Sequence, residues 1–314
     1  ARVHRVAQYH RNLAESVRQS INLRLRLSPD QLDIAVNPEF DGDLMYVRES
    51  ATPVPLSLGK AKITLIGPSR EDLEEQRLEW NEWLRKNKAS LSRVRRQAKD
   101  DASELSNTAQ EVIVPMTNAA NDLANRIVVA ALDVSALDPK KARRLGDRGE
   151  VTVPNLASLM LLVEEKGKSV LLTGDGHADD ILKGLEKAGK LDGDGNLHVD
   201  VLKIQHHGSE HNMTLDFARR ITADHYVFCG NGFANNPETV VIEAIAHARF
   251  GAPEERSTNP AADGDFTFWF NSTAETSHYR KHMRKVHSLL NDLVADSGGR
   301  MSYEMHADHF DVPF

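Results

Sequence analysis

Residues 169–176, SVLLTGDG, and residues 199–209, VDVLKIQHHGS, decide the fold of this chain. Each is an apolar run of strand length that ends in a polar cluster. Strand ends are where a rigid scaffold presents side chains into a cleft. The two segments therefore predict two strands that carry Asp175, His206 and His207 at their carboxyl ends.

The elements around these segments alternate between strands and helices. Apolar runs and turn signals predict further strands at 61–68, 158–164, 225–229, 266–270 and 301–306, and helices at 178–189, 214–221, 237–249 and 274–295. Residues 70–110 are expected to form one long helix or a helical pair. The strands 158–164 and 169–173 form a hairpin and are too continuously apolar to face water on either side. This alternation predicts an α/β fold.

The bulk composition excludes several classes of protein. The chain has 314 residues and a formal net charge of −7, so any nucleic-acid contact must come from a local patch. No apolar run approaches the roughly 18 residues of a membrane-spanning helix. The single cysteine, Cys229, excludes an intrachain disulfide and fits a reducing, cytoplasmic compartment.

One local basic patch lies between residues 85 and 99, where seven Lys and Arg residues fall within fifteen positions. Arg93, Arg95 and Arg96 are its candidate phosphate contacts. The alternative interpretation is a solvated helix face.

An aspartate and a histidine pair held at strand ends suit a divalent metal ion. The carboxylate supplies oxygen and the imidazole supplies nitrogen, which are ligands that zinc accepts. A carboxylate can also bridge two ions in a two-metal hydrolytic site. Each feature alone is weak evidence for a metal site, because a Gly-Asp pair after a strand usually forms a turn and two adjacent histidines usually have unrelated roles. The combination with the preceding Asn155–Ser158 segment and the hairpin is more specific.

This order, a hairpin followed by TGD, a helix and a strand entering HHGS, resembles the metallo-β-lactamase-fold hydrolases. It is similar in particular to the branch containing the nuclease-like domain of bacterial DNA-uptake channel proteins. The resemblance covers about residues 55–250 and implies a four-layer αββα sandwich. Residues 1–250 would be the C-terminal half of this domain, with a helical insertion at about 70–150. Residues 251–314 would be an extension packing on the same domain.

The resemblance also implies roles. Asp175 matches the carboxylate that bridges the two metal ions of each site, which are zinc or manganese. His207 matches the histidine ligand that comes late in the family's sequence. His206 would be its neighbour, although the two can be exchanged. Ser209 and His211 would contact substrate at the cleft.

The first half of the family's metal site is missing from this sequence. No H-x-H-x-D-H motif occurs, and no histidine lies between His10 and His177. His4 and His10 are alternative ligands in a helical context, and His177 is expected to face solvent at a helix N-terminus. We therefore expect an N-terminal half of the same hydrolase as a partner, either a second polypeptide or a segment outside this sequence.

The function that follows is hydrolysis of a phosphodiester, most simply in nucleic acid, by a metal-bound hydroxide. The alternatives are a metallo-hydrolase of another ester, amide or lactam, and a non-catalytic pseudo-hydrolase that acts as a binding partner.

Overall fold

The computed structural model describes residues 26–27, 31–33, 35, 37–40, 44–49, 52–53, 55–86, 145–307 and 309–313. The chain divides into two compact units, one formed by Ala1–Leu44 and Arg77–Ala142 and the other by Met45–Gln76 and Arg143–Phe314. The described strands and the histidine motif all belong to the second unit.

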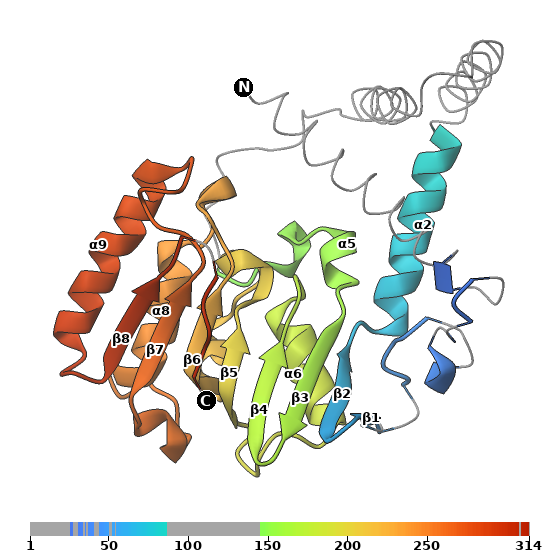
Figure 1. Cartoon of the computed structure of the whole chain (residues 1–314), viewed down its shortest axis with the longest axis horizontal. Coiled ribbons are helices and arrows are strands. Elements are labelled where there is room, and N and C mark those ends of the chain that lie inside the picture. Colours follow the sequence, from blue (N-terminus) through green and yellow to red (C-terminus); the bar gives the residue numbers. More distant parts are fainter. Residues whose placement is uncertain are drawn as a thin grey trace. The chain divides into compact units, whose positions relative to one another are not determined.

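This unit is built on one mixed sheet of eight strands in sequential order (Figure 1). The strands are β1 Leu56–Leu58, β2 Ala61–Gly67, β3 Met160–Glu165, β4 Lys168–Leu172, β5 Leu197–Lys203, β6 Ile221–Phe228, β7 Phe266–Phe270 and β8 Met301–Met305. The first three pairings, from β1 to β4, are antiparallel. The four from β4 to β8 are parallel. The predicted α/β class is therefore confirmed.

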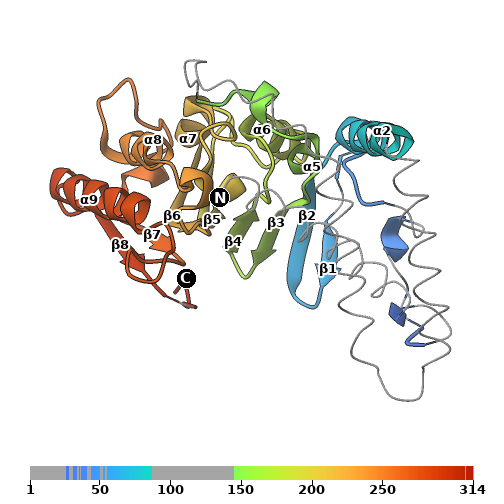
Figure 2. The ribbon, with the colours of Figure 1, turned by 90° about the horizontal axis from the view of Figure 1, so that it is seen from above.

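Helices connect the parallel strands. The longer described helices are α2 Arg70–Lys86, α6 Ala178–Lys187, α7 Leu215–Arg220, α8 Thr239–Phe250 and α9 Arg280–Asp296, and α5 Val153–Leu156 is a single turn. From α6 to α9 each helix joins two adjacent parallel strands, and the strand order always advances in one direction. Right-handed crossovers in such a series place their helices on the same face, as Figure 2 shows. None of the described helices is long and apolar enough to cross a membrane.

The two faces of the sheet are buried to different extents at β3 and β4. On the helix side Leu162 and Leu171 are 1% and 0% exposed. On the opposite side their neighbours Leu161 and Val163 are only half-buried, and Leu172 is 39% exposed. Among the described residues, the expected burial of this hairpin therefore holds for one face only.

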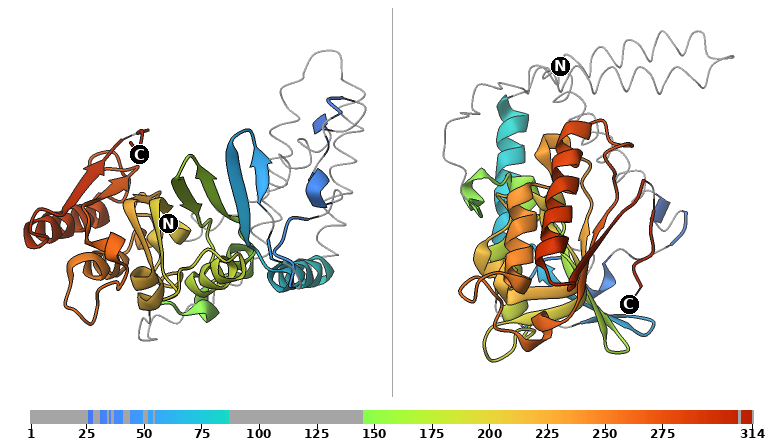
Figure 3. Two further views of the ribbon diagram at one scale, coloured as in Figure 1. Left: turned by 90° about the horizontal axis from the view of Figure 1, so that it is seen from below. Right: turned by 90° about the vertical axis from the view of Figure 1, so that its left-hand side faces the viewer.

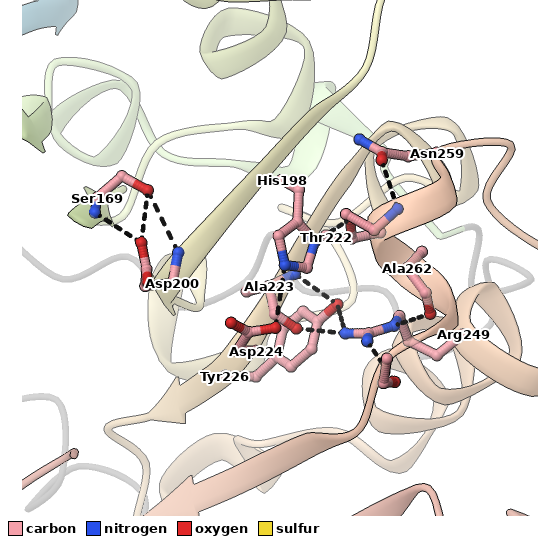
Figure 4. Close-up of polar contacts among 12 residues, drawn as sticks. Ser169, His198, Asp200, Thr222, Ala223, Asp224, Tyr226, Arg249, Asn259 and Ala262 are labelled. Atoms are coloured by element: carbon pink, nitrogen blue, oxygen red, sulfur yellow. Dashed lines mark hydrogen bonds and ion pairs between the residues drawn. The ribbon is translucent and has the colours of Figure 1, made fainter. Parts of the chain in front are cut away.

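The C-terminal part continues the same sheet. β7 pairs with β6 and β8 pairs with β7, and α8 and α9 lie side by side (Figure 3). A buried arginine, Arg249 of α8, donates to the carbonyls of Ala223, Ala262 and Gly264 (Figure 4). A buried charge is tolerated when its donors are satisfied. Arg249 thereby ties α8 and the loop after it to β6.

Candidate functional site

The two polar clusters meet because β4 and β5 are adjacent and parallel. Leu172, at the end of β4, pairs with Lys203, at the end of β5. Three residues on, the His206 amide donates to the Gly174 carbonyl at 3.1 Å. The sheet thus brings the TGD turn and the HHGS segment to one edge, as the strand pattern predicts.

The histidine pair sits on a strained backbone. His206 and His207 have φ of +43° and +58°, and Gly208 follows at +85°. Non-glycine residues in this left-handed region cost free energy and cluster at functional sites. The turn lets consecutive side chains leave the end of β5, with ring centroids 5.9 Å apart.

The hydrogen bonds of Asn212 fix the tautomer of His206. The Asn212 amide nitrogen donates to the carbonyls of Asp175 (2.8 Å) and Gly176 (3.2 Å), so its oxygen is the acceptor. That oxygen lies 2.7 Å from Nδ1 of His206. His206 must therefore carry its proton on Nδ1, and Nε2 keeps the lone pair. The amide nitrogen of Asn155 lies 3.4 Å from Nε2 and donates to it.

His207 is held in the same tautomer by a different acceptor. Its Nδ1 lies 2.7 Å from the Cys229 carbonyl, which can only accept. Nδ1 therefore carries the proton, and Nε2 keeps its lone pair on an exposed ring. A histidine whose Nδ1 donates to a backbone carbonyl is the arrangement that orients metal ligands.

A half-buried ammonium group lies beside Asp175. Nζ of Lys203 donates to the Gly174 carbonyl and lies 3.8 Å from Oδ1 of Asp175. The Asp175 amide donates to Oγ of Ser158 at 3.1 Å, which anchors the turn to the segment before β3. The carboxylate is 33% exposed, so it remains accessible to a ligand.

Burial governs the electrostatics of this edge. It lowers the pKa of His206, and the hydrogen bond to Asn212 and the charge of Asp175 oppose this shift only in part. Burial likewise lowers the pKa of Lys203, with Asp175 opposing, and raises the pKa of the Cys229 thiol. His206 is consequently neutral near pH 7, the state in which an imidazole can bind a metal ion.

The donor types and tautomers fit part of a zinc site, namely one carboxylate and two imidazole nitrogens. However, the described residues contain no group of three or more His, Cys, Asp or Glu that could hold an ion. Asp175, His206 and His207 therefore do not converge into a complete site by themselves. Any further ligands would have to come from outside the described part of the chain.

The remaining predicted residues have different positions. Ser209 is 4% exposed, whereas it was expected at the mouth of a cleft. His211 is half-buried, and its Nδ1 has no hydrogen-bond partner among the described residues. Arg93, Arg95 and Arg96, together with His4 and His10, lie outside the described residues.

The expectation for His177 was wrong. This side chain is completely buried rather than solvent-facing. Its Nδ1 accepts from the Asp179 amide and so caps α6, while Nε2 donates to the Gly146 carbonyl at 3.2 Å. His177 is thus a structural residue that joins α6 to the loop before α5.

Two site residues were missed from the sequence, Lys203 and Asn212. A lysine that interrupts an apolar strand three residues before His206 was a usable signal for the first. Asn212 carries no comparable signal, because its role depends on a loop that folds back onto Asp175.

Comparisons of the chain with protein-family models, curated proteins and solved structures found no match. Inference about function therefore rests on the geometry of this edge and on the sequence motif.

Proposed function

We propose that this chain is the C-terminal half of a metallo-β-lactamase-fold hydrolase that cleaves phosphodiesters in nucleic acid. The observation that carries the proposal is the histidine pair. Both rings hold their proton on Nδ1 through a fixed oxygen acceptor, at the edge of the sheet that also carries Asp175. This is the arrangement that a metal-ligating histidine needs.

The fold supports the same proposal. A four-layer αββα sandwich is made of two sheets packed face to face, each with helices on its outer face. Here the crossover helices occupy one face of a mixed sheet, and Leu172 on the other face is 39% exposed. An N-terminal half with its own sheet would cover this face and supply the missing ligands.

The residues would divide the chemistry as follows. A pair of zinc ions would lower the pKa of water and polarise a phosphoryl oxygen. The Asp175 carboxylate would orient the attacking water, and His207 would complete the ligand shell. Lys203 lies beside Asp175 and would hold the TGD turn in place through the Gly174 carbonyl. The basic residues of 85–99 would supply affinity for the phosphate backbone, in a cytoplasm where Cys229 stays a thiol.

Two observations favour a second candidate, the non-catalytic pseudo-hydrolase. The Lys203 ammonium lies 3.8 Å from Asp175, and the described residues gather no three-ligand group. An ammonium can neutralise a carboxylate that lacks its metal. In that case the chain binds a partner through this fold without hydrolysis.

The deciding experiment measures metal content and phosphodiesterase activity on the chain co-expressed with its N-terminal half. The expected content is about two zinc or manganese ions per complex. Asp175→Ala and His207→Ala should each lower hydrolysis of bis(p-nitrophenyl) phosphate by at least about 100-fold, since even residues behind the ligands contribute 10- to 100-fold. His206→Ala should cost less.

His278→Ala is the control, because His278 is exposed and is not one of the candidate site residues. Unfolding temperatures should stay unchanged in Asp175→Ala, His207→Ala and His278→Ala. A complex without metal and without activity would support the pseudo-hydrolase. Equal loss at His206 with no loss at His207 would show that the two histidines exchange roles.

A further inference from the structure

A separate pocket lies at the opposite ends of β4 and β5 from Asp175 and His207. Its volume is about 500 Å³, and it is lined by residues of β2 and β3, the β3–β4 turn and the start of β5. Strands of this length at about 3.3 Å per residue put roughly 15–20 Å between the two strand ends. The pocket is therefore distinct from the candidate metal site.

The net charge of the pocket lining is opposite in sign to that of the whole chain. Acidic residues outnumber basic ones in the whole sequence, 46 to 39. In the pocket five lysines face two glutamates, an excess of three positive charges. The lysines are Lys60, Lys62, Lys166, Lys168 and Lys190.

Three of these lysines are neutralised by neighbours. Lys190 binds Glu164 at 2.5 Å, and Lys168 binds Asp200 at 2.8 Å. Lys166 lies 3.6 Å from Glu165. Lys60 and Lys62 form no ion pair with any residue that the structure describes. Among the described residues, the ammonium groups of Lys60 and Lys62, both in the β1–β2 hairpin, are therefore the pocket lysines without a direct ion pair.

Part of the pocket lining is apolar. Leu162 and Leu197 line it together with the ring of His198. Nε2 of His198 donates to Asp224 at 3.0 Å, so Nδ1 accepts from the Thr222 hydroxyl at 2.9 Å (Figure 4). Since Asp224 can only accept, these bonds fix the ring in one tautomer. The ring thus forms a fixed flat wall.

We propose that this lysine-lined pocket binds a small organic ligand that carries two or more phosphate groups. Its volume is within the range of small-molecule sites, whereas single-stranded nucleic acid follows an extended groove. Lysine binds phosphate as a point charge, so Lys60 and Lys62 would each take one phosphate group. Leu162, Leu197 and His198 would contact the organic part.

The test is isothermal titration calorimetry on the full chain at fixed ionic strength, with ATP and inorganic tripolyphosphate as probes. The double variant Lys60→Gln/Lys62→Gln should bind both at least about tenfold more weakly, a loss of about 1.4 kcal/mol. Lys183→Gln is the matched control, because Lys183 is exposed on α6 and does not line the pocket. It should bind like the wild type. ATP should bind more tightly than tripolyphosphate if the apolar wall contributes.

NMR signals of two histidine rings report where the ligand binds. ATP should shift the His198 signal and leave that of His207 unchanged, and Asp175→Ala should retain binding. No binding of either probe at millimolar concentration, or equal affinity of the double variant and the wild type, overturns the proposal. A response at His207 instead of His198 also overturns it. So does a single-stranded oligonucleotide that binds through Lys60 and Lys62 where ATP does not.

Discussion

His206 and His207 are neighbours in the chain, yet separate parts of the fold orient them. His206 donates to the side chain of Asn212, and His207 donates to the carbonyl of Cys229. Both lie in the left-handed region, which glycine occupies without strain but which costs free energy for a residue with a Cβ. The strained backbone and the two fixed tautomers support the proposal that the pair is a functional unit.

The first prediction concerns Asn212. Replacing it with alanine removes the acceptor of His206 Nδ1 and the donors to Asp175 and Gly176. Because Asn212 is fully buried, we expect the free energy of unfolding to fall by about 1–3 kcal/mol. The ring of His206 should lose its single tautomer. Long-range ¹H–¹⁵N spectra of the histidine rings at pH 7.5 measure this change.

Asn212→Asp separates the two roles of this residue. It keeps an oxygen for His206 Nδ1 but loses the donors to the turn. We expect this variant to be destabilised like Asn212→Ala while His206 remains protonated on Nδ1. A wild-type spectrum with the proton on Nε2 of His206 would contradict the assignment of the tautomer.

The second prediction concerns pH and His198. Burial lowers the pKa of His198, with the hydrogen bond and charge of Asp224 opposing. The pKa of histidine in the unfolded chain is about 6.5. Below this pH, the unfolded chain therefore binds more protons than the folded chain. The free energy of unfolding must then fall as the pH falls through this window, by at most about 1.4 kcal/mol per unit. His198→Gln should remove this contribution.

Urea unfolding at pH 7.5 and pH 5.5 measures the effect. The loss of stability between the two values should be smaller in His198→Gln than in the wild type. His278→Gln, at an exposed position, should behave like the wild type. An equal loss in all three proteins would show that the protonation of His198 is not linked to folding.

At the scale of elements, α6 is positioned by its glycine. A Cβ on Gly184 would overlap the carbonyl of Ile66 in β2. Gly→Ala inside a helix normally stabilises by about 0.5–1 kcal/mol. Here the steric conflict with backbone reverses the sign, so we predict that Gly184→Ala lowers the free energy of unfolding by about 1–3 kcal/mol. Chemical denaturation measures it.

Gly193→Ala is the matched control. Nothing lies within 4 Å of a Cβ at this position, and its backbone is not left-handed. It should leave the stability within about 0.5 kcal/mol of the wild type. A stabilised Gly184→Ala protein would mean that α6 does not approach β2 as closely as described.

Most elements of the sheet could be predicted because each is an uninterrupted apolar run between turn residues. The predictions of 61–68 and 266–270 agree with β2 and β7 to within one residue. β1 was missed because three residues after a proline carry no periodic signal. The helix predicted from 274 begins at Arg280 because the Thr273 hydroxyl accepts from the amides of Glu275 and Thr276 and holds a turn there.

Only the motif residues of the candidate site could be predicted from the sequence. Strand ends identify Asp175 and the histidine pair because their position follows from the local pattern. The residues that set tautomer and charge come from loops and neighbouring strands, and contacts of this kind are not encoded locally. The cap formed by His177 is a similar case, since its partner Gly146 is distant in sequence.

At the scale of the molecule, the sequential strand order has a consequence for assembly. Each connection between parallel strands moves to the next strand in the same direction. Because such connections are right-handed, all the connecting helices lie on one face of the sheet. Parallel sheets are normally covered on both faces. The exposed face around Leu172, at the end of the parallel-paired strand β4, is therefore where a second layer is expected. In the proposed sandwich this layer is the sheet of the N-terminal half.

The last prediction compares Leu171 and Leu172, adjacent residues on opposite faces of β4. Leu171 is 0% exposed beneath the helices and Leu172 is 39% exposed. In the chain alone, Leu171→Ala should lower the free energy of unfolding by about 2–5 kcal/mol, and Leu172→Ala by less than about 1 kcal/mol. With the N-terminal half present, Leu172→Ala should instead weaken association, because the leucine would be buried between the sheets. Urea unfolding and analytical ultracentrifugation measure the two effects. If Leu172→Ala destabilises the isolated chain as much as Leu171→Ala does, the chain covers this face itself, and the split sandwich is refuted.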